Sequence, residues 1–90
     1  MVDLLRLGSI VRIDGIKGEY LIIGYFPEDP KTGAIYTYLG INDKVGMSFN
    51  EDAIFFNQDR ITEIVYEGYS DEESDEFRAK LRDYMRTPRV

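Results

Sequence analysis

A junction in the second half of the chain separates a part with strand patterns from a part with a helix pattern. Residues 60–67 are rich in β-branched and aromatic residues, which favour a strand, and Gly68 interrupts them. Ser70 and Glu73 then fit the S-x-x-E capping box that begins a helix. We therefore expect strands before this junction and one helix after it.

The expected helix has the charge order and the periodicity of a helix that packs against a sheet. Its first turns are acidic and its last turns are basic, which suits the helix dipole. Pro88 prevents continuation, so the helix should occupy residues 70–87. Apolar side chains at helical spacing should face the sheet, and they are Phe77, Leu81, Tyr84 and Met85.

The strongest strand pattern runs from Glu19 to Phe26, and both of its faces are apolar. Such a strand belongs at the centre of a sheet, and Gly24 within it favours a bend or bulge. Three consecutive large apolar residues at 54–56 should cross the end of the sheet and fill the core. Turn residues separate the remaining strand patterns, which cover residues 9–13, 34–41 and 60–67, with a short strand or bridge at 47–49.

These elements predict one domain over residues 1–90, with a β-rich core at 1–69 and a C-terminal helix at 70–87. The expected fold is mainly β: a small bent antiparallel sheet or an SH3-like barrel, with the helix over its open side or end. The alternative is an open α+β sheet with the helix packed across one face.

The chain lacks the side chains that most enzymes use for catalysis. The chain has no His and no Cys, and therefore lacks the usual general base, the best nucleophile and the commonest metal ligands. Glu63 and Glu67 share a strand face but should lie about 13 Å apart, beyond the roughly 5–10 Å of a glycosidase pair. The acids at 67–76 lack the spacing of a calcium loop and fit a solvated helix start. We expect no enzymatic activity, no catalytic residue, no cofactor and no metal.

Negative charge is concentrated in the second half of the chain. The net charge is −6; residues 1–45 hold six acids and five bases, and residues 46–90 hold eleven acids and six bases. An acidic protein is unsuited to nucleic-acid phosphates, so we expect a protein partner with a cationic surface and no nucleic acid. No signal peptide is visible, and the longest apolar run, residues 20–23, is too short to insert into a membrane. We therefore expect a cytoplasmic location.

Four tyrosines are the candidates for a partner-binding surface: Tyr36, Tyr38, Tyr66 and Tyr69. Tyr36 and Tyr38 occupy alternate positions of one strand pattern, and Tyr66 and Tyr69 flank the strand–helix junction. The alternative is that these rings pack in the core and leave only their hydroxyl groups in water, as tyrosines usually do.

Five short motifs occur in order along the chain: LLRLGSIV at 4–11, YLIIG at 20–24, YxYLG at 36–40, FFNxxxI at 55–61 and VYEGYxDEE at 65–73. In this combination the chain resembles the small uncharacterised-domain proteins encoded beside LXG-type toxins in type VII secretion loci of Gram-positive bacteria. The resemblance implies a cytoplasmic accessory factor, adaptor or chaperone-like, that binds a secreted toxin or its targeting factor. The alternative function is that of an immunity protein whose acidic surface neutralises a cationic toxin domain.

Overall fold

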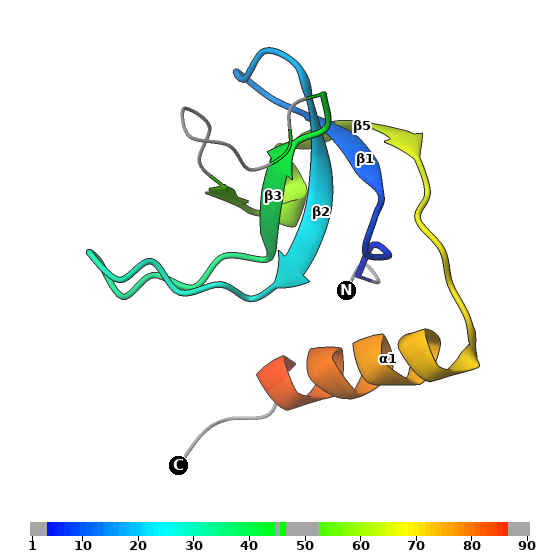
Figure 1. The fold of residues 1–90 in the computed structure, drawn as a ribbon. Coiled ribbons are helices and arrows are strands. Elements are labelled where there is room, and N and C mark those ends of the chain that lie inside the picture. The colour runs from blue at the N-terminus through cyan, green and yellow to red at the C-terminus, as the bar shows by residue number, and fades with distance from the viewer. Residues whose placement is uncertain (1–3, 45, 47–52, 87–90) are drawn as a thin grey trace.

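The computed structural model describes residues 4–44, 46 and 53–86, which form an antiparallel sheet followed by one helix (Figure 1). The elements are β1 (Ile10–Ile13), β2 (Glu19–Tyr25), β3 (Tyr38–Asn42), β4 (Ile54–Phe56), the 3-10 turn η1 (Gln58–Arg60), β5 (Ile61–Tyr66) and α1 (Glu72–Arg86). The sheet order is β4-β3-β2-β1-β5 and, over the described residues, β4 and β5 do not pair, so the sheet is open. The predicted class, mainly β with a C-terminal helix, is confirmed, and the strand expected at 47–49 lies outside the described residues.

The β2 strand lies at the centre of the sheet, as its two apolar faces predict. Ile22 is fully buried in the core, whereas Ile23 on the opposite face is partly exposed. Ile22 pairs with Gly40 but Gly24 pairs with Leu39, so Ile23 is an extra residue in the ladder with β3. This is the bulge predicted around Gly24, and it bends the sheet around the core.

The core lies on one face of the bent sheet. Tyr38 is fully buried within it, and its ring packs against the rings of Phe56 and Tyr25 with centroid separations of 5.6 and 6.1 Å. The buried apolar residues come from four of the five strands, and they are Val11, Ile13, Tyr20, Ile22, Tyr38 and Phe56. The only described strand absent from this set is β5, whose residues are mostly exposed.

Two strand predictions are corrected by the structure. The pattern at 34–41 starts too early, because β3 begins at Tyr38 and the residues before it belong to an arm closed by a bridge between Glu28 and Ile35. Residues 54–56 do not cross the end of the sheet but form its edge strand, β4. Alternation along this strand turns Phe56 into the core, and Phe55 instead stacks on Tyr36.

The β5 strand is an edge strand with two irregularities. Its ladder with β1 shifts register twice, and Thr62 and Val65 are the residues that have no partner in it. Each extra residue interrupts the alternation of faces and increases the local twist. This irregular edge is a poor template for the addition of another strand.

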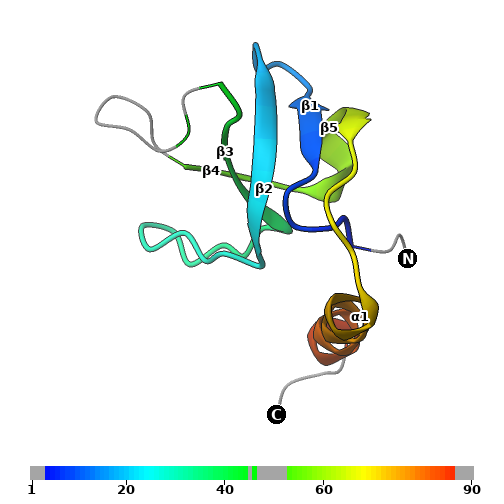
Figure 2. The ribbon, with the colours of Figure 1, turned by 45° about the vertical axis from the view of Figure 1, so that its right-hand side comes forward.

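The α1 helix lies beyond the end of the sheet where β2 ends and β1 begins, and does not cover a face (Figures 1 and 2). Its N-cap is Asp71: the Ser74 N–H donates to Asp71 Oδ1 at 2.8 Å, and the Asp71 N–H donates to Ser74 Oγ at 3.0 Å. The reciprocal cap is therefore one residue later than the predicted pair of Ser70 and Glu73. The hydroxyl of Ser70 is instead bonded to the side chains of Asp75 and Arg78.

The face that α1 turns toward the sheet matches the predicted one only in part, because Leu81 and Met85 are half-buried and the other two predicted residues are not. Phe77 is 54% exposed and Tyr84 is 60% exposed, although both were expected to be buried. The side chain of Arg78, by contrast, is only 10% exposed. The Arg78 side chain donates to Ser70 Oγ and Asp75 Oδ1, both in or next to the first turns of α1.

Candidate functional site

At Gly68, the segment after β5 packs directly against the segment before β1. The Gly68 N–H donates to the buried Ser9 Oγ at 3.0 Å. A Cβ at this position would lie 2.0 Å from the carbonyl oxygen of Leu7, so only glycine allows this approach. Beside it, Arg6 and Glu67 form an ion pair at 3.7 Å. The two segments therefore form one surface between the sheet and α1.

Exposed apolar side chains gather on β5 and the residues that follow it. Tyr66 is 61% exposed and Tyr69 is 74% exposed, and Ile64 and Val65 are also exposed. We call these four residues the β5 strip. Single exposed apolar residues are normal, but a group of four within six positions is typical of an interaction surface. Glu63 and Glu67 lie within the same segment, and both side chains are exposed to solvent.

The structure separates the four tyrosines predicted to bind a partner. Tyr66 and Tyr69 lie together in the β5 strip. Tyr36 is half-buried and stacks on Phe55. Tyr38 is a core residue whose hydroxyl accepts from the Leu5 N–H at 3.0 Å and donates to the side chain of Gln58. A partner could not contact Tyr38 without opening the sheet, which removes it from the candidate surface.

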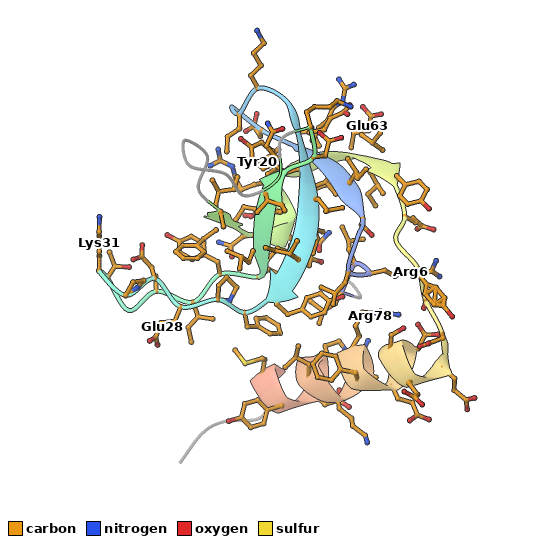
Figure 3. The ribbon with its side chains drawn as sticks, viewed as in Figure 1. Arg6, Tyr20, Glu28, Lys31, Glu63 and Arg78 are labelled. Carbon is orange, nitrogen blue, oxygen red and sulfur yellow. The ribbon has the colours of Figure 1, made fainter. Side chains whose placement is uncertain are left out.

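A polar cavity of about 420 Å³ lies between α1 and the N-terminal segment. Figure 3 shows Arg78 rising from the helix toward this segment, with Arg6 on the side of the segment that follows β5. The cavity is lined by Leu4, Leu5, Arg6, Ser9, Glu67, Asp75, Arg78, Ala79 and Arg82. We call it the arginine cavity, because three of its charged side chains are guanidinium groups.

Tyr25 and Arg78 fasten the helix to the end of the sheet. The Tyr25 hydroxyl donates to the carbonyl oxygen of Leu5, and the Tyr25 ring lies 6.4 Å from that of Phe77. Burial raises the pKa of Tyr25 above its ordinary value, and the hydrogen bond and charge of Arg78 partly offset this increase. The Tyr25 hydroxyl therefore remains neutral at physiological pH.

An apolar cavity of about 460 Å³ adjoins the arginine cavity, and the two share Leu4 and Arg82. Its lining residues are Leu4, Phe26, Ile35, Tyr36, Thr37, Gln58, Arg82 and Met85. Phe26 has a φ of 51°, a left-handed conformation that is unfavourable for a bulky residue. Hydrogen bonds on both sides maintain this conformation, from the Phe26 N–H to Thr37 O and from the Tyr36 N–H to Pro27 O.

Neither cavity was predicted from the sequence. Arg78 and Arg82 lie four residues apart and therefore share a helix face, which is the only sequence signal for the arginine cavity. That spacing is also common on solvated helices, and nothing in the sequence indicates the conformation of Phe26.

Within the described part of the chain, no three acidic, His or Cys side chains gather as a potential metal site. The helix found there is neither long nor apolar enough to cross a membrane.

Comparison with known protein families finds a match for most of the chain. A family model described as "Domain of unknown function (DUF4176)" matches residues 4–77, which contain the whole sheet, the β5 strip and the start of α1. Neither the curated proteins nor the solved structures compared with the chain include a match.

Proposed function

The chain belongs to the DUF4176 family, and from this premise we propose that it is a non-enzymatic accessory factor that binds another protein. The observation that carries this function is the β5 strip, where two tyrosines and two aliphatic residues are exposed together. Tyrosine is enriched at protein interfaces because its ring buries a large area while its hydroxyl keeps a polar contact. The absence of His and Cys supports a role in binding rather than in catalysis.

The charge around the β5 strip supports a cationic partner. Glu63 and Glu67 lie beside the strip residues, exposed and in long ion pairs of 3.7 Å with Arg12 and Arg6. The acidic first turn of α1, with Glu72, Glu73 and Asp75, follows along the chain. Acidic groups at the rim of an apolar patch attract a positively charged partner and accelerate association. The motifs shared with type VII accessory proteins support a secreted LXG toxin or its targeting factor as that partner, in the cytoplasm of a Gram-positive bacterium.

Co-purification of the chain with a neighbouring LXG toxin tests this function. Replacement of both Tyr66 and Tyr69 by Ser should reduce recovery of the complex at least tenfold, because their rings would form the centre of the interface. Tyr84→Ser is the matched control, since Tyr84 is equally exposed but lies on α1. Undiminished recovery with the double variant, or an equal loss with the control, would contradict this use of the strip.

The same acidic surface is also consistent with an immunity protein. Co-expression with the toxin domain distinguishes the two roles. Survival of the host cells indicates immunity, whereas formation of a complex without protection indicates an accessory factor.

A further inference from the structure

We propose that the sheet face opposite the core, here called the outer face, is an interface between two copies of this chain. The two sheets would pack face to face, related by a two-fold axis that runs along the strands. This inference goes beyond the accessory role proposed above and does not depend on it. Tyr66 pairs with Ile10 of the outer face, so the outer face and the β5 strip meet at this tyrosine.

Strand alternation makes the outer face apolar. Val11 on β1 and Ile22 on β2 are buried in the core, so their neighbours along each strand point to the opposite side. Directly paired residues share a face of the sheet, and the ladders continue this second face from β1 to β4. Its apolar side chains are Ile10, Leu21, Ile23, Leu39, Ile41 and Phe55.

The described helix and strands leave the outer face uncovered. All five strands lie in one sheet and α1 lies beyond the end of that sheet, so none of these elements packs over this face (Figures 1 and 2). None of its six apolar side chains is fully buried, and Ile23 is 37% exposed. A sheet that is apolar on both faces is normally covered on both, as in a sandwich of two sheets. A second layer therefore has to come from another molecule.

A row of alternating charges crosses one end of the outer face. Ion pairs join Glu63 to Arg12 at 3.7 Å, Arg12 to Glu19 at 3.0 Å, and Glu19 to Lys44 at 3.8 Å. We call these four residues the charge row. Asp43 also lies 3.3 Å from Lys44, but its side chain is only 9% exposed. The charge row thus presents two negative and two positive groups, with no net charge, in a protein whose net charge is −6.

The order of the charge row selects a second copy as the occupant. From β5 to β3 the signs are negative, positive, negative, positive, and a two-fold axis between β1 and β2 reverses this order in the facing copy. Glu63 then faces Lys44 of the second copy, and Arg12 faces Glu19 of the second copy. Two-fold interfaces require such self-complementarity, and facing charges of opposite sign fix the register. A partner of a single sign would instead meet like charges at two of the four positions.

The geometry of the sheet favours contact through the face and sets its strength. The irregular β5 edge is a poor template for edge-to-edge pairing. Stacked sheets lie about 10 Å apart, which encloses the apolar side chains of both copies. Five strands and four residues along each give a footprint of about 19 Å by 13 Å. This is smaller than the contact that buries about 800 Å² per partner in a standard interface, so the dimer should dissociate on dilution.

Sedimentation equilibrium of the full chain, from micromolar to millimolar protein, tests the dimer. The average mass should rise with concentration from that of one chain toward that of two, and a single chain at every concentration would overturn the proposal. Ile23→Glu should weaken dimerisation at least tenfold, because Ile23 lies on the central strand. Ile16→Glu is the matched control, since Ile16 is 39% exposed but lies in the turn between β1 and β2. Equal weakening by both changes would contradict the placement of the interface.

Two charge reversals test the charge row itself. Arg12→Glu or Glu19→Arg alone places like charges opposite each other across the axis, so each variant should dimerise several-fold more weakly than the parent. When the two variants are mixed, opposite charges face each other again at both positions. The mixture should therefore associate more tightly than either variant alone, which would also show that both variants are folded. A mixture that associates no better than its components would overturn the two-fold arrangement.

The dimer and the β5 strip can be tested separately. Tyr69 follows β5 and lies outside the sheet, so Tyr69→Ser should leave dimerisation unchanged. Ile23→Glu should leave recovery of the toxin complex unchanged, because Ile23 lies on β2, outside the β5 strip. Failure of the dimer is thus distinguishable from failure of the accessory function.

Discussion

At the scale of single residues, Tyr38 connects parts of the chain that are far apart in sequence. Its hydroxyl bonds the Leu5 N–H and the side chain of Gln58, while its ring lies between those of Phe56 and Tyr25. A buried hydroxyl with two partners is costly to remove, because both partners lose their hydrogen bond.

Tyr38→Phe should therefore lower the free energy of unfolding by about 1–3 kcal/mol, measured by urea denaturation. Tyr66→Phe is the control, since its hydroxyl is at an exposed position and the change should be within about 0.5 kcal/mol. If the Tyr38→Phe protein is as stable as the parent, these hydrogen bonds make no net contribution to the free energy of unfolding.

Gly68 is required by close packing between two backbones. A Cβ would lie 2.0 Å from Leu7 O and 2.8 Å from Ser9 N, and neither is the end of a flexible side chain. Gly68→Ala should destabilise the protein by about 1–3 kcal/mol or more, as overpacking does. Gly24→Ala is the matched control, because its Cβ would meet Leu39 at 3.5 Å, an ordinary contact. Thermal unfolding of the two variants gives the comparison, and equal midpoints would disprove the close approach.

At the scale of elements, the cap of α1 makes the start of the helix sensitive to acid. Hydrogen bonding from the Ser74 N–H and hydroxyl lowers the pKa of Asp71 below its ordinary value of 3.8. A lowered pKa means that the cap stabilises the protein when the pH is above the pKa of Asp71 in the unfolded state. This stabilisation is lost as the pH falls through the pKa of Asp71 in the folded state.

Acidification below pH 3.8 should accordingly lower the protection factor of the first-turn amides of α1, that is, their exchange relative to an unfolded peptide at the same pH, measured by NMR at Ser74. Asp71→Asn keeps a capping oxygen but does not titrate, so its first turn should lack this part of the acid response. An unchanged response in Asp71→Asn would show that the Asp71 cap is not the source of the acid sensitivity.

At the scale of the whole molecule, two tyrosines connect the sheet, the N-terminal segment and α1, and both stay neutral when folded. Burial raises the pKa values of Tyr25 and Tyr38 above the ordinary value of 10.0. A raised pKa gives a contribution to stability that is fully present when the pH is below the pKa of the tyrosine in the unfolded state. This contribution decreases as the pH rises through the pKa of the tyrosine in the folded state.

Stability should thus be insensitive to tyrosine ionisation below pH 10 and should decrease above it. Ultraviolet titration, with circular dichroism recorded in parallel, should show Tyr25 and Tyr38 ionising only above pH 10 and together with unfolding. Ionisation of Tyr25 and Tyr38 with no change in circular dichroism would contradict their buried positions.

Local patterns in the sequence predict the elements and much of their order. The apolar faces of residues 19–26 predict the central strand, Gly24 predicts its bulge, and the glycine break at Gly68 separates the sheet from the helix. These predictions succeed because strand alternation and turn chemistry depend on residues only a few positions apart. The predicted cap pair, Ser70 and Glu73, is one residue too early, because Asp71 and Ser74 form the cap.

Only the tertiary structure decides which side chains are available for binding. Tyr38 and Tyr66 are equivalent as sequence signals, yet contacts with residues 33 positions away bury the first, and an irregular edge strand exposes the second. The apolar spacing along α1 likewise predicts one buried face, yet Phe77 and Tyr84 are more than half exposed in the structure. The sequence by itself thus determined strands, turns and a capped helix, because these depend on near neighbours. The β5 strip and the two cavities beside α1 depend on long-range packing, which no local pattern contains.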